Sequence, residues 1–387
     1  MSEPGQIRIR TTKDVVEALR STDPGIRFSI LRAIIQHPEQ AAAYGATEEW
    51  DLVEELCDQA RDLNGSALRT LVLGALVSYK DPRVREIFTK EIHASENAEA
   101  LSLAARYLAG EVEDGEKHSL SGLLLQNNSH KHAQAVADVM MGHKQLNDRE
   151  KIRIALLSSE EFNAPELTKE TEAAWSAELQ GPYASHTRRL LETQGEAAFL
   201  YLRKKWSNLE DEDKKWLLKW GAEKFPVYIV ELILYGLDSG SELQVLAALE
   251  AIIVLKEYGK IFATHTSRYL NSQNPAVRLA AVRAGATVGD WEATLATEEV
   301  VAVKIEMVMR LAEEKGASAA PALIRLIEEG DHRLRAAATS ALQKVSKEVA
   351  ELMKPLMSNP HQAVQVAAVQ VLIAAGEELW LEEQLLA

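Results

Sequence analysis

The sequence predicts an all-α solenoid, a fold in which short helix pairs stack one after another. Three observations support this prediction. The chain has 387 residues, well above the roughly 100–200 of one ordinary domain. Apolar residues make up 47% of the chain but aromatic residues only 6%, so the core must consist mainly of Ala, Leu, Val and Ile, which suit close-packed helices. A short motif also recurs: apart from one gap of 193 residues, its intervals are roughly 30 or roughly 57 residues, the lengths of one and two helix pairs.

The recurring motif combines a turn, an apolar residue, Arg or Gln, and then small apolar residues. Its five copies are DPGIRFSILRAI from Asp23, DPRVREIF from Asp81, NPAVRLAAVRAG from Asn274, GDHRLRAAATSAL from Gly330 and NPHQAVQVAAVQVL from Asn359. Where Asp or Asn precedes Pro, the side chain can accept the free N–H groups of a helix start, and Pro occupies the first helical position without losing a hydrogen bond. The motif therefore predicts the start of a helix.

An arginine follows the cap by one helical turn in four of the copies, as Arg27, Arg85, Arg278 and Arg335. A guanidinium at this position can pair with a capping carboxylate of its own or the preceding repeat. We expect a ladder of ion pairs between repeats, and we expect it to weaken in the last copy, where Gln365 replaces Arg.

The turn–Val–Arg–x–Ala–Ala pattern, as in Val277 to Ala281, resembles HEAT repeats in the short bacterial form also found in phycobilin lyase subunits. The resemblance is clear over residues 20–95 and 270–375 and weak between about 110 and 235, where the Arg and the Ala pair are missing. It implies a right-handed α-solenoid of HEAT-like helix pairs. We expect a disordered segment at 1–11, clear repeats at 12–110, degenerate helical repeats at 111–237, and clear repeats ending in a capping helix at 238–387.

Charge and hydropathy narrow the classes of partner. The formal net charge is −15, which argues against a protein that grips phosphate backbones. The chain has no 18-residue apolar run and its first residues have no apolar signal-peptide core, so we expect a cytoplasmic protein outside the membrane. The single cysteine, Cys57, lies on an apolar helical stripe, which predicts an inert core residue rather than a reactive thiol.

Motifs for catalysis and cofactor binding are missing from the sequence. It contains no intact phosphate loop, no GxGxxG dinucleotide motif and no GxSxG nucleophile motif. Four histidines cluster at His118, His130, His132 and His143, but their spacing does not match known zinc sites. We therefore expect no enzyme activity, no cofactor and no metal.

The stretch from Tyr201 to Lys224 is the best candidate for a binding site, because it contains seven basic and five acidic residues in an otherwise acidic chain. Aromatic rings beside cations suit an anionic or planar partner. Alternatively, Trp216 and Trp220, four residues apart, face the core while the lysines face water. The residues that we predict to bind a partner are Trp206, Lys214, Lys215, Trp216, Lys219 and Trp220.

Solenoid surfaces bind other proteins more often than they catalyse reactions. The sequence therefore favours a non-enzymatic scaffold, adaptor or assembly factor that binds protein partners on the concave surface formed by the second helix of each pair. One alternative is an enzyme or enzyme subunit similar to the phycobilin lyases, holding a tetrapyrrole and its acceptor protein. Another is nucleic-acid binding, as in HEAT-like DNA glycosylases, against which the net acidity weighs.

Overall fold

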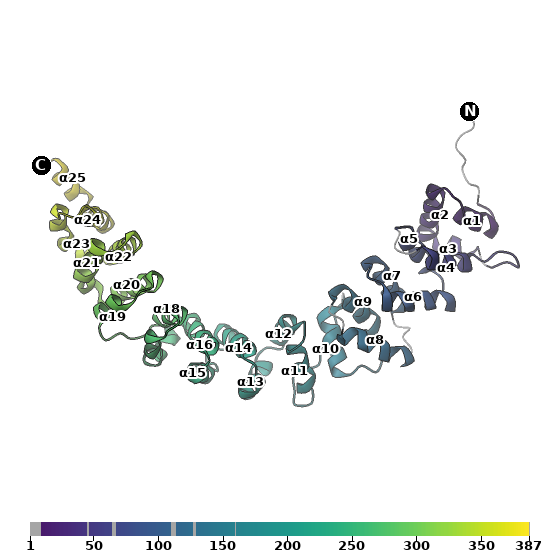
Figure 1. The fold of residues 1–387 in the computed structure, drawn as a ribbon, viewed down its shortest axis with the longest axis horizontal. Helices are drawn as coiled ribbons and strands as arrows, with labels where there is room; N and C mark the ends of the chain where they lie inside the picture. The colour runs from purple at the N-terminus through teal and green to yellow at the C-terminus, as the bar shows by residue number, and fades with distance from the viewer. Residues whose placement is uncertain are drawn as a thin grey trace. The chain divides into compact units, whose positions relative to one another are not determined.

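The computed structural model describes residues 9–44, 46–63, 67–109, 114–126, 129–158 and 160–386. In this part of the chain all regular secondary structure is helical, with no strand, and the helices stack as a solenoid (Figure 1). The predicted all-α solenoid is thereby confirmed. Most of the segment expected to be disordered, residues 1–8 of 1–11, lies outside the described residues.

The chain divides into two compact units, Met1–Ala198 and Phe199–Ala387. The helices of the first unit are α1 (Thr12–Leu19), α2 (Pro24–Gln36), α3 (Pro38–Ala42), α4 (Leu52–Asp62), α5 (Ala67–Leu76), α6 (Pro82–Ala94), α7 (Ala98–Leu108), α8 (Asp114–Gln126), α9 (His130–Met140), α10 (Asp148–Leu157), α11 (Glu172–Leu179) and α12 (Ala184–Thr193). The division falls within α13 (Glu196–Lys204).

The second unit continues with η1 (Trp206–Asn208), α14 (Asp211–Lys224), α15 (Val230–Asp238), α16 (Glu242–Leu255), η2 (Lys256–Phe262), α17 (Ala263–Thr266), η3 (Ser267–Asn271), α18 (Pro275–Arg283), α19 (Trp291–Thr297), α20 (Val301–Lys315), η4 (Gly316–Ala319), α21 (Ala320–Glu329), α22 (His332–Lys344), α23 (Ser346–Met353), η5 (Lys354–Ser358), α24 (Gln362–Ala375) and α25 (Glu378–Leu386). The η segments are short 3-10 helices.

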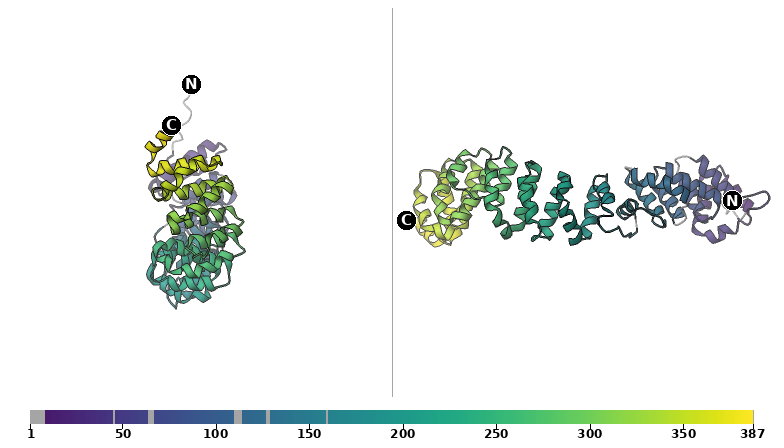
Figure 2. Two further views of the ribbon diagram at one scale, coloured as in Figure 1. Left: turned by 90° about the vertical axis from the view of Figure 1, so that its left-hand side faces the viewer. Right: turned by 90° about the horizontal axis from the view of Figure 1, so that it is seen from below.

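Helices pack in pairs, and the pairs pack on one another. Within a pair, α6 packs on α7, α15 on α16 and α21 on α22. The second helices of neighbouring pairs also contact each other, in the order α5, α7, α9 in the first unit and α14, α16, α18, α20, α22, α24 in the second. Figure 2 shows the helices of the second unit lying side by side in this stack. Consecutive second helices therefore form a continuous surface within that unit.

Small residues let the second helices approach closely, as the motif predicts. Ala281 on α18 and Ala338 on α22 are both fully buried, and Ala368 on α24 is nearly so. Cys57 is also fully buried on α4, and burial raises the pKa of its thiol to about 11. The prediction of an inert core cysteine is confirmed, because the reactive thiolate is disfavoured at neutral pH.

The predicted helix caps are confirmed. Asp23, Asp81 and Asn274 are the N-caps of α2, α6 and α18, and each side chain accepts a backbone N–H two residues ahead, at 2.8 or 2.9 Å. The copies are not equivalent, however. The Asp81 copy begins α6, the first helix of a pair, whereas the others begin second helices. A cap satisfies the N–H groups of any helix start, so the motif cannot distinguish the two kinds of helix.

The predicted arginine ladder is not formed by Arg27 or Arg335. Arg278 does form an ion pair, but with Glu298, which precedes α20 of the following repeat; the Nε–Oε2 distance is 2.7 Å. Arg27 binds the amide oxygen of Gln59 at 3.3 Å rather than a carboxylate. The side chain of Arg335 is exposed and has no hydrogen-bond or ion-pair partner among the described residues. Of these three arginines, only Arg278 therefore has a carboxylate partner.

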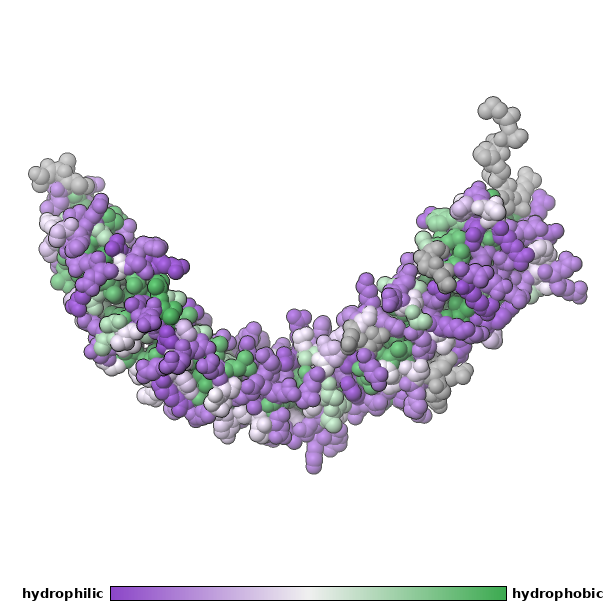
Figure 3. All heavy atoms as spheres, in the orientation of Figure 1, coloured by the Kyte–Doolittle hydropathy of each residue, from purple (hydrophilic) through white to green (hydrophobic). Residues whose placement is uncertain are grey.

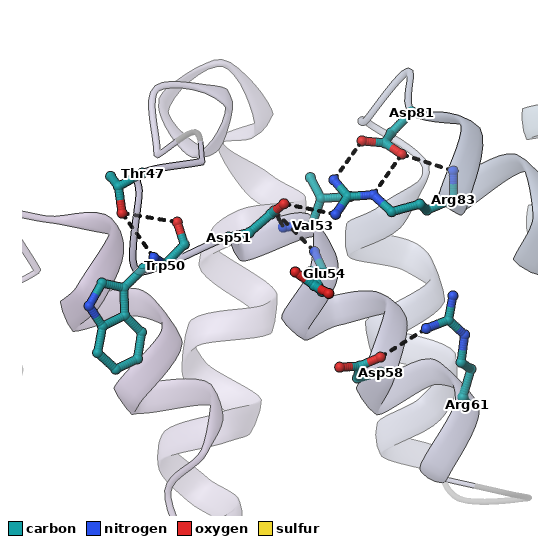
Figure 4. A network of polar contacts seen from close by, with 9 residues as sticks. All are labelled: Thr47, Trp50, Asp51, Val53, Glu54, Asp58, Arg61, Asp81 and Arg83. Carbon is teal, nitrogen blue, oxygen red and sulfur yellow. Dashed lines mark hydrogen bonds and ion pairs between the residues drawn. The ribbon is translucent and has the colours of Figure 1, made fainter.

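A different set of contacts joins positions that lie about one helix pair apart. Each joins a residue at one helix start or in the last turn of a helix to a residue 30–32 positions away: Asp51–Arg83, Asp211–Ser241, Glu242–Asn274 and Glu328–Asn359, at 2.8–3.2 Å. Figure 4 shows the first of them, in which Arg83 binds both Asp51 and Asp81. These contacts recur at the length of one helix pair.

Candidate binding groove at Trp206

The three tryptophans of the predicted site occupy different environments. Trp220 on α14 is 5% exposed and packs edge-on against Phe199 and Phe225, at centroid distances of 5.5 Å. Trp216, half-buried on the same helix, stacks on Trp220 at 5.3 Å with an interplanar angle of 13°. Trp220 therefore belongs to the core, which agrees with the alternative interpretation of this stretch, and Trp216 covers it.

Trp206 lies apart from this aromatic cluster, in the 3-10 turn η1. Its side chain is packed into the protein, with the residue 8% exposed, and the Nζ of Lys214 stands 5.8 Å from the centre of the indole ring. This distance is within the range of a cation–π contact. The structure therefore brings Trp206 and Lys214 together, whereas Lys215 and Lys219 are exposed elsewhere on α14.

Trp206 and Lys214 line a groove with a volume of about 850 Å³. The groove is built from the end of α13, η1, the first turns of α14 and α16, and the length of α15. Lys215, Trp216, Lys219 and Trp220 do not line it. We call it the Trp206 groove and define it by Arg203, Lys204, Trp206, Lys214, Glu231 and Tyr235.

A chain of hydrogen bonds fixes one wall of the groove. Glu231 accepts hydrogen bonds from Arg203 Nη2 and from the Tyr235 hydroxyl, both at 2.6 Å. The bond from Tyr235, together with that from Arg203, holds the pKa of Glu231 below its ordinary value. The same bond raises the pKa of Tyr235. Glu231 therefore stays ionised and holds both neighbours in place, with the Tyr235 residue 48% exposed at the groove.

The charges that line the groove are unequally paired. The lining cations are Arg203, Lys204 and Lys214, and the lining anions are Glu231 and Asp238. Both anions are held by arginines, Glu231 by Arg203 and Asp238 by Arg268. Within the described part of the chain Lys204 is exposed and has no hydrogen-bond or ion-pair partner. The groove can therefore offer an ammonium group and a tyrosine face to a carboxylate-bearing ligand.

Glu231 and Tyr235 were missed by the sequence-based prediction. They lie on α15, in a segment recognised only as helical, and reach the groove because α15 packs on α16. Their spacing of four residues places both on one face of the helix. That spacing was the only signal in the sequence, and it is too common to identify a site.

Among the described residues no three His, Cys, Asp or Glu side chains gather closely enough to hold a metal ion. In these residues no helix is both long and apolar enough to cross a membrane. Figure 3 shows polar residues over most of the visible face of the second unit, with apolar residues between them.

No protein-family model and no curated protein sequence matches the chain. Among solved structures it is similar to a crystal structure of Kap121p, with 12% identity and a TM-score of 0.33 over 94% of this chain and 41% of that one. The karyopherin Kap121p bound to the extreme C-terminus of the protein phosphatase Cdc14p gives 12% identity and a TM-score of 0.32, with the same coverage. Kap121p bound to RanGTP gives 14% and 0.25, over 94% of this chain and 40% of that one. The chain spans about two fifths of the length of these matched chains.

Proposed function

We propose that this chain is a non-enzymatic, cytoplasmic scaffold or adaptor that binds protein partners. The observation that carries the proposal is the Trp206 groove, with cationic side chains around a tryptophan on a helical stack. Stacked helix pairs give a long surface on which several such grooves can act together. The chain's net charge of −15 makes a groove with more cations than anions a local exception.

The groove suits an acidic segment of a partner protein. A partner carboxylate would pair with Lys204, which has no competing acid among the described residues. An apolar or aromatic partner side chain would lie against the exposed ring of Tyr235. Arg203 is less available, because Glu231 already holds it at 2.6 Å. We propose further contacts on the surface formed by the second helices.

The test is a comparative affinity purification of the full-length chain from its cell of origin. Wild type, Lys204→Glu and the control Lys219→Glu would be purified in parallel, and bound proteins quantified by mass spectrometry. Both lysines are exposed and undergo the same charge change, but only Lys204 lines the groove. A stoichiometric partner retained by wild type and the control, and reduced by Lys204→Glu, supports the proposal. Absence of any protein partner contradicts it.

The same purification tests the alternative of a tetrapyrrole-binding enzyme subunit. Tetrapyrroles absorb visible light, so the absorption spectrum of the purified chain reports such a ligand directly. A coloured protein without a protein partner would favour this alternative over the scaffold.

A further inference from the structure

A second groove, with a volume of about 700 Å³, lies between the second helices α22 and α24. One side is formed by Arg335, Ser340 and Gln343 of α22. The other is formed by Gln362, Val366 and Gln370 of α24. We call it the Arg335 groove and define it by these six residues. Its residues and helices are separate from those of the Trp206 groove, so the two sites can be tested independently.

The Arg335 side chain lacks the ion pair that the equivalent arginine forms in the preceding copy of the motif. At the same motif position one copy earlier, Arg278 is held by Glu298, which lies 20 residues ahead. The residue 20 positions ahead of Arg335 is Pro355, which offers no acid. The guanidinium of Arg335 is exposed at the groove and has no partner in the described part of the chain.

The carboxylate in the lining of this groove already has a hydrogen-bond partner. Glu328, at the end of α21, also lines the groove, and its Oε1 accepts a hydrogen bond from Asn359 Nδ2 at 3.2 Å. No ion pair joins Glu328 to Arg335 among the described residues. The guanidinium is therefore available to a carboxylate from outside, with which Arg forms two parallel hydrogen bonds.

The α24 side of the groove has the spacing of an extended peptide. Gln362, Val366 and Gln370 are four residues apart on one helix, so their Cα atoms rise in steps of about 6 Å. Two residues of an extended chain span about 6.6–6.8 Å. An extended segment lying along α24 would therefore present equivalent groups to each of these side chains in turn.

The chemistry of the lining also fits a peptide backbone. Glutamine amides both donate and accept hydrogen bonds, as the N–H and C=O groups of an extended chain do. Gln362 and Gln370 are exposed, and Val366 between them is 49% exposed. The lining thus offers two amides that can bind the backbone of an extended peptide, with an apolar side chain between them.

We propose that the Arg335 groove binds an extended segment of a partner protein and pairs Arg335 with an Asp or Glu side chain of that segment. The Gln side chains of α24 bind its backbone, and Val366 contacts an apolar side chain.

The experiment uses the immobilised full-length chain and a library of N-acetylated, C-amidated octapeptides, in which each position in turn is fixed as Asp, Glu, Lys or Ala. The variants are Arg335→Ala and the control Arg333→Ala, an exposed arginine on the same helix that does not line the groove. We expect wild type and the control to enrich an acidic residue at one position. We expect Arg335→Ala to lose this selection and to bind the best peptide about tenfold more weakly, the loss of one charge-assisted contact.

A second readout tests the extended conformation. The best peptide is resynthesised with N-methyl groups on alternate residues, which remove N–H donors on one side of the strand. We expect one of the two methylation patterns to abolish binding and the other to preserve most of it. The proposal fails if no acidic residue is enriched, if Arg335→Ala selects as wild type does, or if both patterns bind equally. Oligothymidylate is tested as a separate probe, and tighter binding of oligothymidylate than of every peptide would identify a phosphate site and overturn the proposal.

Discussion

Arg83 joins the N-cap carboxylates of the first helices of two successive pairs, α4 and α6. Its Nη1 lies 2.8 Å from Asp51 Oδ2, and its Nη2 lies 2.8 Å from Asp81 Oδ2 (Figure 4). Asp51 caps α4 and Asp81 caps α6, so one guanidinium bridges two helix starts. The hydrogen bond from Arg83 holds the pKa of Asp81 below its ordinary value, although burial acts against it. The N-cap of the first helix of one pair is thereby tied to the N-cap of the first helix of the next pair.

Arg83→Ala should lower the free energy of unfolding by about 1–2 kcal/mol, because it leaves two partly buried carboxylates without their cation. The matched control is Arg61→Ala. Arg61 forms an exposed ion pair with Asp58 at 2.8 Å on α4, and its loss should cost less than about 0.5 kcal/mol. Urea denaturation followed by circular dichroism measures both. Equal losses in the two variants would show that the bridge adds nothing beyond a surface pair.

Arg278 and Arg335 occupy the same position in two copies of the motif but should differ in their effect on stability. The Arg278–Glu298 pair is largely buried, with side-chain exposures of 15% and 4%, so Arg278→Ala should cost about 3 kcal/mol. Arg335 is exposed and has no partner in the described residues, so Arg335→Ala should change stability by less than about 0.5 kcal/mol. Thermal unfolding of both variants decides this; similar losses would restore the ladder that the sequence suggested.

The Arg278–Glu298 pair should also make stability depend on pH. Hydrogen bonds from Arg278, together with one from Val300 N–H, hold the pKa of Glu298 below its ordinary value of 4.5, although burial opposes them. A carboxyl with a lowered folded-state pKa stabilises the protein above the pKa it has in the unfolded chain, and this contribution is lost as the pH falls through the folded-state value. Glu298→Gln should therefore be less stable than wild type at pH 6, and the difference should shrink between pH 5 and pH 3. A constant difference across that range would contradict the prediction.

Lys256 is the one non-glycine residue with a positive φ in the described part of the chain, at φ 51° and ψ −117°. It follows the second helix α16, and the residue that follows the second helix α20 is Gly316, at φ 55° and ψ −136°. Because side chains disfavour this conformation, Lys256→Gly should stabilise the protein by about 0.5–1 kcal/mol. Gly316→Ala should destabilise the protein by about 1 kcal/mol, because it introduces a side chain into the same conformation. A lower melting temperature for Lys256→Gly would mean that the lysine side chain contributes more than the strain costs.

The sequence predicted the elements whose causes are local. An Asp or Asn side chain followed by Pro determines a helix start through groups only two or three residues apart, and Asp23, Asp81 and Asn274 all cap helices as expected. Which helix of a pair each cap begins depends on the packing of distant segments, and there the Asp81 copy misled. The arginine ladder failed for the same reason, since its partners are supplied by neighbouring repeats.

The candidate site was predicted in part. Trp206 and Lys214 do line a common groove, but the run of basic and aromatic residues on α14 divides between core, groove and open surface because a helix turns by about 100° per residue. Glu231 and Tyr235 reach the groove from another helix. No pattern along the chain predicts that these two residues lie beside Trp206, so only the three-dimensional structure identifies them as lining the groove.

The most direct test of the central claim, that the Trp206 groove binds an acidic segment of a protein partner, is the affinity of the co-purified partner for three forms of the full-length chain. Isothermal titration calorimetry would compare wild type, Lys204→Glu and Lys219→Glu at moderate salt. We predict that Lys204→Glu weakens binding by about tenfold or more, because it replaces an attractive charge by a repulsive one, and that Lys219→Glu changes affinity by less than about twofold. Equal affinities for wild type and Lys204→Glu would contradict the account.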